Sequence, residues 1–361
     1  MKIAILGTRG IPNNYGGFEQ CAEHLSVSLV EHGYDVTVYS TSNHQYNKHQ
    51  FKGVQIIKKW CPENVIGSSA HFIYDFLCLR DALKRRFDVI FEFGYQSAAL
   101  SFILLPIKDA RIVTNMDGLE WKRDKWSPFV KRMTKWFEKI ATKKSTVLIS
   151  DNKGIKDYLN TKYSLESVMI PYGAIEEKLD SSVVSYYNVK LDSYFLLIAR
   201  LEPENNIEII LDGYINSKIE SPFLVVGNKR TKYGRFLEDK YKGVRFLDSI
   251  FNKKHLDSLR GFSKGYFHGH SVGGTNPSLL EAMAAKSFIF AHDNVFNRDV
   301  LEQNAFFFSN AKEVSKMLHD FNNLVCKKKK MVDNNIKKIR CKYSHTNITK
   351  QYIDLINEVT L

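Results

Sequence analysis

The sequence predicts an α/β protein made of two doubly wound halves of similar size. Residues 2–7 form the apolar run of a buried parallel strand, and a glycine-rich stretch and a helical pattern follow directly. A second series of alternating strand and helix patterns begins at residue 194. The chain has 361 residues, of which 44% are hydrophobic and 25% charged, so its length and composition fit a folded protein with two cores.

The first forty residues have the order of a βαβ unit. Apolar side chains recur at helical spacing from Phe18 to Leu29, Gly33 ends that helix, and a second strand is predicted at residues 35–40. Further strands are predicted at residues 54–58, 89–93, 111–115 and 146–150. Because helical patterns separate most of these strands, we expect a doubly wound sheet.

The second half repeats this alternation after an interruption. The pattern weakens between residues 173 and 192, where polar residues break it, and restarts with a strand at residues 194–199. Predicted strands follow at residues 223–227, 244–247, 265–268 and 287–291, and predicted helices at 252–260 and 277–285. We therefore expect a first domain over residues 1–180 and a second over residues 181–340.

Composition excludes several classes of protein. Five widely spaced cysteines without a C-x-x-C pair indicate neither a disulfide framework nor a zinc site, and a reducing cytoplasm is the expected compartment. The longest mainly apolar run, residues 98–107, is about half the length of a membrane-spanning helix. Residues 1–10 lack the features of a signal peptide, so we expect a soluble protein. The formal net charge of +13 favours an anionic partner, which leaves nucleic acid, anionic lipid and phosphorylated substrates open.

Two glycine-rich loops follow predicted strands. The first, at residues 7–19, carries four glycines and Arg9, so an anion can approach its N–H groups closely. It has neither a G-x-G-x-x-G nor a P-loop pattern, and a tight turn without a ligand is the alternative. The second, at residues 268–276, leads into a helix that Asn276 caps and Pro277 begins, so a diphosphate would fit at its N-terminus.

Polar side chains beside the second loop are candidate ligand contacts. Glu281 lies one turn into the helix, where it can accept a hydrogen bond from a sugar hydroxyl, unless it is an ordinary exposed carboxylate. Arg200 ends the strand at residues 194–199, where its guanidinium can bind phosphate, unless one of the glutamates that follow pairs with it. His268 and His270 lack further ligands at metal-binding spacing, so they either contact the ligand or have a structural role.

Asp117 and Glu120 follow the predicted strand at residues 111–115 and lie three residues apart. One carboxylate at such a strand end can act on a hydroxyl as an acid or a base. An Asp followed by a Glu three residues later also begins ordinary helices, so a capping role is the alternative.

A basic and aromatic segment extends from residue 122 to residue 144. It contains nine Lys or Arg residues against two acidic ones, interleaved with Trp and Phe. This composition suits the headgroup region of an anionic membrane, and a solvated helix with its aromatic side chains in the core is the alternative. The residues expected at the membrane are Lys122, Arg123, Lys125, Trp126, Lys131 and Arg132.

Several segments together resemble a known family. ARLEPENN (199–206), NPSLLEAM (276–283) and IPYGA (170–174) are similar to the retaining glycosyltransferases of family 4, which have the GT-B fold. The two glycine loops, GTRGIPNNYGGFE (7–19) and HGHSVGGTNPS (268–278), resemble the bacterial rhamnosyltransferase-like branch that builds capsule, O-antigen and cell-wall polysaccharides. The resemblance covers essentially the whole chain.

The resemblance implies two Rossmann-like domains that face each other across a cleft, with residues 341–361 forming a helix that returns to the first domain. It implies a nucleotide-diphosphate sugar held by the second domain, an acceptor held by the first, and catalysis without a cofactor or an essential metal. We expect transfer of L-rhamnose from dTDP-rhamnose, with retention, to a lipid-diphosphate-linked saccharide. The expected location is cytoplasmic, peripheral on the inner face of the plasma membrane.

The resemblance also assigns roles to residues. Glu281 matches the second glutamate of the E-x7-E motif, which holds the ribose, and Arg200 matches the arginine that neutralises the diphosphate. The chain departs from the family at Gly273, where the first glutamate would stand, and at Asn205, where a lysine would stand. We expect His268, His270 and nearby N–H groups to replace them.

The expected donor contacts are Gly16, Gly17, Arg200, His268, His270, Gly274, Thr275, Asn276, Ser278, Leu279 and Glu281. The expected acceptor contacts are Arg9, Tyr15, Asp117 and Glu120. Of these residues, Asp117, Glu120 and Arg200 are the expected catalytic residues.

Three alternatives remain. A UDP- or GDP-hexose donor would use the same loops, because these contact mainly phosphate and hydroxyl groups. A nicotinamide-dependent dehydrogenase would need a G-x-G-x-x-G pattern, which is absent, and would leave the second glycine loop unexplained. A non-catalytic protein that binds nucleic acid or membrane would leave both loops unexplained, so no nucleic-acid partner is expected.

Overall fold

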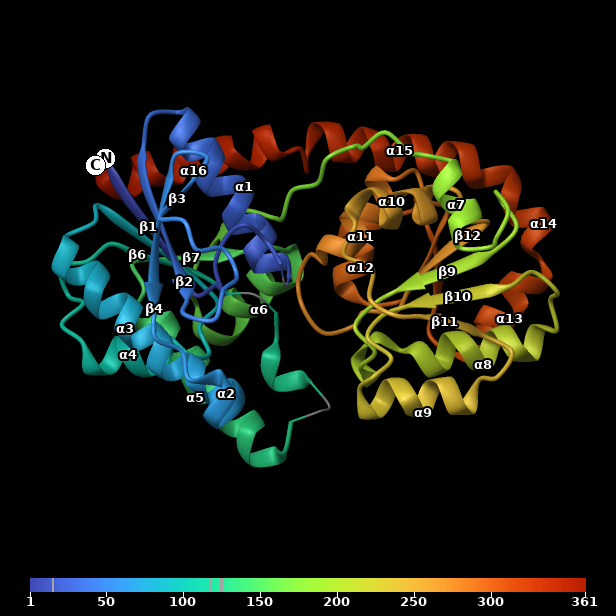
Figure 1. Ribbon diagram of the computed structural model, residues 1–361, viewed down its shortest axis with the longest axis horizontal. Helices are drawn as coiled ribbons and strands as arrows, with labels where there is room; N and C mark the ends of the chain where they lie inside the picture. The colour runs from blue at the N-terminus through green and yellow to red at the C-terminus, as the bar shows by residue number, and fades with distance from the viewer. Residues whose placement is uncertain (15, 117, 124–125) are drawn as a thin grey trace. The chain divides into compact units, whose positions relative to one another are not determined.

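The computed structural model describes residues 1–14, 16–116, 118–123 and 126–361 (Figure 1). The chain divides into two compact units, one formed by Met1–Tyr172 with His345–Leu361 and the other by Gly173–Ser344. Each unit is an α/β domain around one mainly parallel sheet, so the predicted class of two doubly wound domains is confirmed. Across the described ranges, no helix has the length and apolar character that a membrane span requires.

The sheet of the first unit has, among the described residues, eight strands in the order β3-β4-β2-β1-β5-β6-β7-β8. Neighbouring strands are parallel, except that β3 pairs antiparallel with β4. From β4 to β7 this is the Rossmann order. The strands are β1 Lys2–Leu6, β2 Asp35–Thr41, β3 Gln50–Phe51, β4 Val54–Lys59, β5 Val89–Phe93, β6 Ile112–Asn115, β7 Val147–Ser150 and β8 Val168–Met169.

Helices cover both faces of this sheet (Figure 1). On one face, α1 and α16 bury Leu25, Leu29, Tyr352 and Ile356 against the strands, and α3, α4 and α5 lie on the other. The C-terminal helix therefore contributes to the core of the first unit. The helices are α1 Gly17–Glu31, α2 Glu63–Ile66, α3 Ala70–Arg85, α4 Ala99–Leu104, α5 Pro128–Lys144, α6 Lys153–Tyr163 and α16 His345–Thr360.

The sheet of the second unit is fully parallel, and its six described strands have the order β11-β10-β9-β12-β13-β14, again the Rossmann order. The core on one face joins the strands to α8, α9, α13 and α14. The strands are β9 Phe195–Ile198, β10 Phe223–Val226, β11 Arg245–Leu247, β12 Gly265–His268, β13 Ile289–His292 and β14 Phe306–Phe308. The helices are α7 Ser182–Tyr186, α8 Ile207–Ser217, α9 Lys232–Lys240, α10 Lys253–Gly261, α11 Pro277–Ala284, α12 Val295–Leu301, α13 Ala311–His319, α14 Phe321–Leu324 and α15 Lys328–Cys341.

Strand order in each sheet changes direction at the first strand, between β1 and β5 in one unit and between β9 and β12 in the other. Open α/β sheets bind ligands beyond the carboxyl ends of the strands that flank this point. In the first unit, β1 leads into the first glycine loop. In the second unit, β9 leads to Arg200 and β12 leads into the second glycine loop. Each predicted loop therefore lies at the ligand-binding edge of its own sheet.

The units meet in the sequence at Tyr172 and His345 rather than at the predicted residues 180 and 341. The Ala174 N–H donates to the Tyr343 carbonyl at 2.8 Å. Asp180 pairs with Lys254 at 2.7 Å, and its N–H donates to the Ser258 hydroxyl at 3.0 Å. These contacts fix residues 173–180 to the second unit. The predicted boundary followed the gap in the strand and helix pattern. The segment at residues 173–180 lies in that gap, and its hydrogen bonds and ion pair decide that it belongs to the second unit.

Candidate functional site

Arg200 follows β9 and is exposed. Among the residues that the structure describes, none forms an ion pair with its guanidinium, so the salt bridge expected as its alternative role is not formed. Its carbonyl oxygen accepts a hydrogen bond from the side chain of Asn205 at 2.7 Å. Arg200 therefore presents an unneutralised positive charge at the carboxyl end of a parallel strand.

Three residues of the turn after Arg200 hold the second glycine loop. Asn205 bonds the ring of His270, with Oδ1 and Nδ1 2.9 Å apart. Asn206 donates to the Gly269 carbonyl at 2.7 Å, and the N–H of Ser271 donates to the Glu204 carbonyl at 3.2 Å. The loop after β12 is thereby fixed to the loop after β9.

Gly269 allows this close approach. A Cβ atom at this position would lie 1.9 Å from the carbonyl oxygen of Asn205, which is backbone and cannot rotate away. Only glycine fits there, and the constraint comes from the contact rather than from an unusual backbone angle.

Two asparagines of the β13–α12 connection hold the same loop from its other side. Asn294 and Asn297 both donate to the His270 carbonyl oxygen, at 3.1 and 3.0 Å. The side-chain oxygen of Asn294 also caps α12. Sequence reasoning missed both residues. Two asparagines three residues apart after the predicted strand at residues 287–291 were the available signal, and helix capping would have explained only one of them.

The helix α11 begins as predicted. Asn276 accepts a hydrogen bond from the Ser278 N–H at 2.9 Å, and Pro277 occupies the first helical position. Gly274, Thr275 and Leu279 are buried. The Leu279 N–H donates to the Asn276 carbonyl at 3.0 Å, so this residue contributes to the helix and the core.

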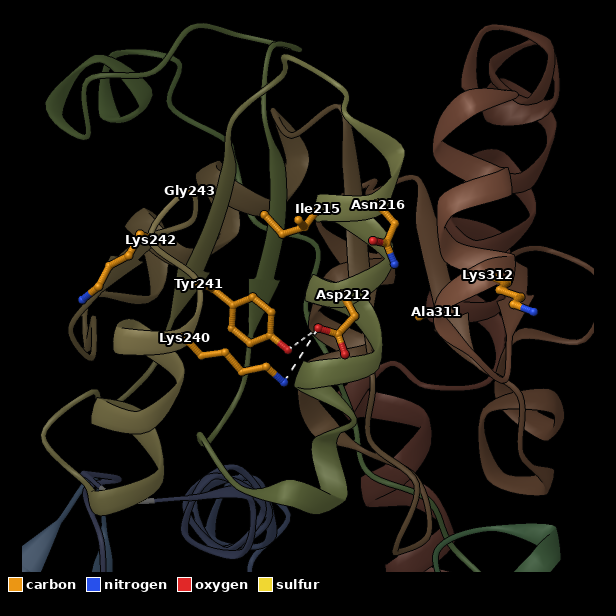
Figure 2. A pocket seen from close by; sticks show the side chains of 9 residues that line it. All are labelled: Asp212, Ile215, Asn216, Lys240, Tyr241, Lys242, Gly243, Ala311 and Lys312. Atoms are coloured by element: carbon orange, nitrogen blue, oxygen red, sulfur yellow. Dashed lines mark hydrogen bonds and ion pairs between the residues drawn. The ribbon is translucent and has the colours of Figure 1, made fainter.

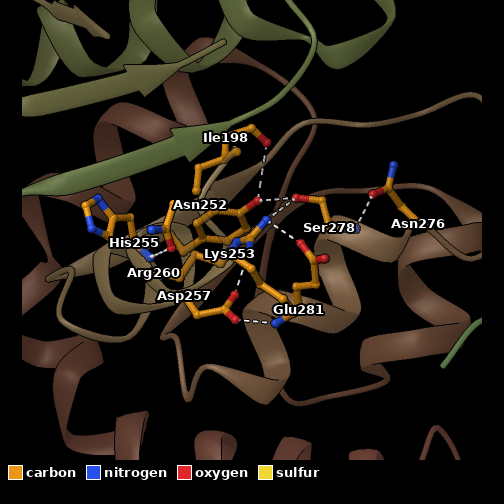
Figure 3. Close-up of polar contacts among 10 residues, drawn as sticks. Ile198, Asn252, Lys253, His255, Asp257, Arg260, Asn276, Ser278 and Glu281 are labelled. Carbon is orange, nitrogen blue, oxygen red and sulfur yellow. Dashed lines mark hydrogen bonds and ion pairs between the residues drawn. The ribbon is translucent and has the colours of Figure 1, made fainter. Parts of the chain in front are cut away.

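A buried arginine, missed by sequence reasoning, lies beneath this helix (Figure 3). Arg260 on α10 donates to Glu281 at 2.7 Å, to Asp257 at 2.9 Å and to the Ser278 hydroxyl at 2.9 Å, and its side chain is 2% exposed. Burial opposes its charge, but the Glu281 and Asp257 carboxylates raise its pKa above the ordinary range, so it stays charged. We call Arg260, Asp257, Glu281 and Ser278 the Arg260 cluster; it fixes the carboxylate of Glu281.

His268 lies at the end of β12 and is 4% exposed. Burial and the charge of Arg260 lower its pKa to about 3, so the ring is neutral. Its Nε2 is buried, and the described chain offers it no hydrogen-bond partner. His268 therefore supplies no positive charge to this site. His270 lies in the second glycine loop, where Asn205 bonds its ring.

In the first unit, the Arg9 guanidinium pairs with both carboxylate oxygens of Glu63, at 2.7 and 3.2 Å. Gly16 is the extended N-cap residue of α1, and Gly17 is the first residue of that helix. The carboxylate of Glu120 pairs with Arg123, which is buried. Tyr15 and Asp117, two of the predicted acceptor contacts, lie outside the described residues.

Two buried acids near the first glycine loop were also missed. Glu92, on β5, is 1% exposed, and neither of its carboxylate oxygens has a described hydrogen-bond partner. It lies directly against Gly7, where an added Cβ would be 2.6 Å from Oε1. On α3, burial raises the pKa of Asp75 to about 7. A carboxylate inside the apolar run of residues 89–93 was the signal in the sequence.

One group of possible metal ligands occurs among the described residues, and it lies in the first unit. Cys61, Glu63 and His71 bring their ligand atoms within 4.8 Å of one another. The Glu63 carboxylate is already paired with Arg9 through both oxygens. The local charge of the carboxylate is thus balanced by an arginine, and we assign no metal to this group.

The predicted membrane segment forms the short turn at Glu120–Lys122 and the helix α5. Lys122 and Arg132 are exposed, Trp126 and Lys131 are half-buried, Arg123 is buried, and Lys125 is not among the described residues. Large apolar side chains are exposed beside these charges: Phe129 is 75% exposed and Trp136 49%. Leu104, on the neighbouring α4, is 68% exposed. We call these exposed residues of α4 and α5 the α5 surface.

A hollow of about 650 Å³ opens on the second unit between α8, the end of α9 and the start of α13 (Figure 2). Tyr241 donates to Asp212 at 2.7 Å, and Lys240 lies 3.8 Å from the same carboxylate. None of the predicted site residues lines this hollow. It is therefore separate from the Arg200 and His270 loops.

A family model matches the first half of this chain in sequence. Residues 1–175 match the model of a domain of unknown function, DUF1972. No protein of curated function matches the chain in sequence.

Solved structures match nearly the whole chain. Sucrose-phosphate synthase from Thermosynechococcus elongatus has a TM-score of 0.83 at 14% identity, covering 99% of this chain and 98% of that one. HepE from Anabaena, solved with UDP and glucose, has a TM-score of 0.76 at 15% identity, with 99% and 100% covered. A glycosyltransferase from Rickettsia africae has a TM-score of 0.73 at 13% identity, with 99% and 98% covered. The shared fold is GT-B.

Proposed function

We propose that the protein is a glycosyltransferase that takes its sugar from a nucleotide-diphosphate donor bound by the second unit. The observation that carries this proposal is the unneutralised Arg200, which lies at the carboxyl end of β9 and is tied to the glycine loop before α11. A diphosphate needs a cation and the positive end of a helix dipole, and Arg200 together with the N-terminus of α11 would supply them. The GT-B fold supports the proposal because the similar HepE structure holds UDP and glucose.

The reaction follows from where charge develops. As the bond between the sugar's anomeric carbon and the diphosphate oxygen breaks, negative charge grows on the diphosphate. Arg200 and the N-terminal end of α11 stabilise that charge. A hydroxyl of the acceptor forms the new bond on the face that the diphosphate leaves, and its proton passes to the departing phosphate oxygen. The anomeric configuration is retained, and this reaction requires no covalent nucleophile from the chain.

Glu281 binds the ribose of the donor in this proposal. Its Oε2 is held by Arg260 at 2.7 Å, so the carboxylate has a fixed direction before the donor arrives. A carboxylate accepts hydrogen bonds from two neighbouring hydroxyls, which is what a ribose offers. Arg260 and Asp257 act as supports and do not touch the donor.

We propose dTDP-rhamnose as the donor, supported by the resemblance of both glycine loops to the rhamnosyltransferase-like branch. A UDP-hexose is the second candidate, because HepE was solved with UDP and glucose. The acceptor is a lipid-diphosphate-linked saccharide of bacterial surface polysaccharide synthesis, held by the first unit near Arg9 and Glu120.

The α5 surface supports a membrane-bound acceptor. Phe129, Trp136 and Leu104 expose apolar area next to Arg132, and such a surface binds anionic lipid through both kinds of contact. The protein then works on the inner face of the plasma membrane.

A thermal-shift panel tests donor binding. The panel contains dTDP, UDP, GDP, their common sugar conjugates and NAD, because a ligand that binds only the folded chain raises Tm. We expect dTDP-rhamnose to raise Tm, and we expect Arg200→Ala to lose the shift. The matched control is Arg235→Ala, an exposed arginine on α9 of the same unit. A shift with NAD alone, or an equal shift in the Arg200 variant, would contradict the proposal.

A further inference from the structure

Two buried carboxyl groups lie beneath the first glycine loop without a cation to neutralise them. Glu92 of β5 is 1% exposed, and Asp75 of α3 is 3% exposed. No basic side chain of the described ranges acts on either group, and neither oxygen of Glu92 has a described hydrogen-bond partner. Two negative charges are costly in such a place, so the pair is stable only while it holds a proton.

The two carboxyl groups share one environment. Burial raises the pKa of Glu92 well above its ordinary value, and the neighbouring Asp75 raises it further. Burial also raises the pKa of Asp75, and a hydrogen bond from Ser97 opposes this effect. Burial is the largest cause of the raised pKa values of Tyr74 and Cys78 on α3, and both acids add to it. Tyr74 therefore keeps its proton and remains a hydrogen-bond donor.

The pair contacts the first two residues of the glycine loop, one from each of its elements. Gly7 packs on β5, where an added Cβ atom would lie 2.6 Å from Oε1 of Glu92. Tyr74, the residue before Asp75 on α3, donates to the Thr8 carbonyl oxygen at 2.9 Å in a fully buried bond. A movement of α3 away from β5 would therefore break the bond that holds the loop.

We propose that Asp75 and Glu92 form a proton-binding site that fastens the first glycine loop. While the pair holds a proton, α3 stays against β5 and Tyr74 keeps its bond to Thr8. When the proton leaves to solvent and both carboxyl groups are ionised, their repulsion separates the two elements and releases the loop. Arg9 follows Thr8, so release also moves a predicted acceptor contact; this consequence rests on the function proposed above, whereas the proton-binding site does not.

The pair is distinct from the histidines near the loop. His44 bonds the Pro12 carbonyl through Nε2 at 3.1 Å, and Nε2 of His71 lies 3.8 Å from the Glu63 carboxylate. Burial is the main cause of the lowered pKa of both histidines, so they lose their protons at lower pH than the pair. The Glu63 carboxylate is itself neutralised by Arg9.

The elements around Glu92 bring no further charge to it within the described part of the chain. Its partners on the flanking strands are Leu6 of β1 and Thr114 of β6, which do not ionise. Lys59 of β4 is paired with Asp81 at 3.0 Å. A titration of the loop above the range of the histidines therefore reports the acid pair.

Carboxyl signals test the proton-binding site without any ligand. In the full chain labelled with 13C at the Asp and Glu carboxyl groups, the carbon shift distinguishes a protonated from an ionised group, and Glu92→Gln and Asp75→Asn assign the two signals. We expect at least one of the two groups to be protonated at about pH 6, where exposed carboxyl groups are ionised. Two ionised groups at that pH would overturn the proton-binding site.

The amide signal of Thr8 tests the fastening of the loop. In the parent chain we expect a step in its shift between about pH 6 and pH 9, with the midpoint of the carboxyl titration. Glu92→Gln, which has the shape of a protonated glutamate, should remove the step, and so should Asp75→Asn. The matched control is Glu138→Gln, because Glu138 is also 1% exposed but accepts hydrogen bonds from two tyrosine hydroxyls at 2.7 and 2.6 Å. A parent chain without the step, or an equal step in Glu92→Gln, would overturn the fastening.

Nucleotide release tests the consequence for the acceptor. With dTDP-rhamnose or UDP-glucose and a lipid-diphosphate saccharide extract, release by the parent chain should fall about tenfold for each pH unit above the midpoint, because the protonated fraction falls tenfold. Glu92→Gln should not show this fall, whereas Glu138→Gln should. Equal pH profiles of the parent chain and Glu92→Gln would overturn the link to the acceptor. If no release occurs at any pH, the proposed function fails, and the carboxyl and amide titrations still decide the proton-binding site and the fastening.

Discussion

Replacing Arg260 by methionine removes the positive charge at the centre of the Arg260 cluster while keeping a side chain of similar reach. The Arg260 side chain is 2% exposed, Asp257 4% and Glu281 16%, so the substitution leaves two carboxylates with little access to water. Breaking such a buried pair costs about 3 to 5 kcal/mol. Lys253 still pairs with Asp257, so we expect the lower end, about 3 kcal/mol.

The assay separates the two units. The four tryptophans lie at positions 60, 121, 126 and 136, all in the first unit, so their fluorescence reports that unit, whereas far-ultraviolet circular dichroism reports both. In urea, Arg260→Met should shift the dichroism transition to lower concentration and leave the fluorescence midpoint unchanged.

A second substitution tests the cause. Adding Glu281→Gln to Arg260→Met removes one unpaired charge and should recover about 1 to 2 kcal/mol. A loss below about 1 kcal/mol in the single variant, or no recovery in the double variant, would refute the view that the arginine neutralises Glu281.

Three further predictions concern other parts of the chain. Burial raises the pKa of Asp75 to about 7 in the folded chain against an ordinary 3.8, so the stability that its protonated form contributes is full below pH 4 and is lost as the pH rises through 7. Asp75→Asn should reduce the pH dependence of the free energy of unfolding in urea titrations between pH 4 and 8. Gly269→Ala places a Cβ atom against the backbone, so it should lower the free energy of unfolding by about 3 kcal/mol and abolish nucleotide-induced thermal shifts. Gly243→Ala is the control, because its Cβ would lie 3.6 Å from Ile215, and it should keep both the stability and the thermal shifts. Phe129→Ser should lower the affinity for anionic vesicles about tenfold in a sedimentation assay. Phe251 is 84% exposed on the second unit, and Phe251→Ser should leave the affinity unchanged; equal losses in the two variants would refute binding through the α5 surface.

Much of the fold could be predicted because buried parallel strands are short apolar runs between breaks. The predicted strands at residues 89–93 and 265–268 have the bounds of β5 and β12. β8 has two residues and β14 three, which is too short for a pattern to appear. The antiparallel β3 is equally short, and a turn at Lys52 and Gly53, both with positive φ, joins it to β4.

The candidate site was only partly predictable. Arg200 follows a strand, and Asn276 and Glu281 lie at or near the start of a helix, so their places in the fold could be predicted from the sequence. Arg260 could not be found in this way because arginine is rarely buried, and its partners come from separate turns of α10 and α11.

The role of Asn205 was hidden for a different reason. The family that the chain resembles has a lysine at this position, so the sequence shows Asn205 only as a departure from the family. Its hydrogen bonds join it to Arg200 and His270, which are 5 and 65 residues away along the chain. Contacts from a side chain to a distant backbone or ring leave no periodic trace in the sequence. Only the folded chain brings such residues together.

Release of the nucleoside diphosphate tests the central claim most directly. The chain is incubated with dTDP-rhamnose, UDP-glucose or GDP-mannose and a lipid-diphosphate saccharide extract, and the free nucleotide is quantified. We predict release from one of these donors, loss of release in Arg200→Ala, and unchanged release in Arg235→Ala. No release from any of the donors, or equal release by the two variants, would contradict a donor site built on Arg200.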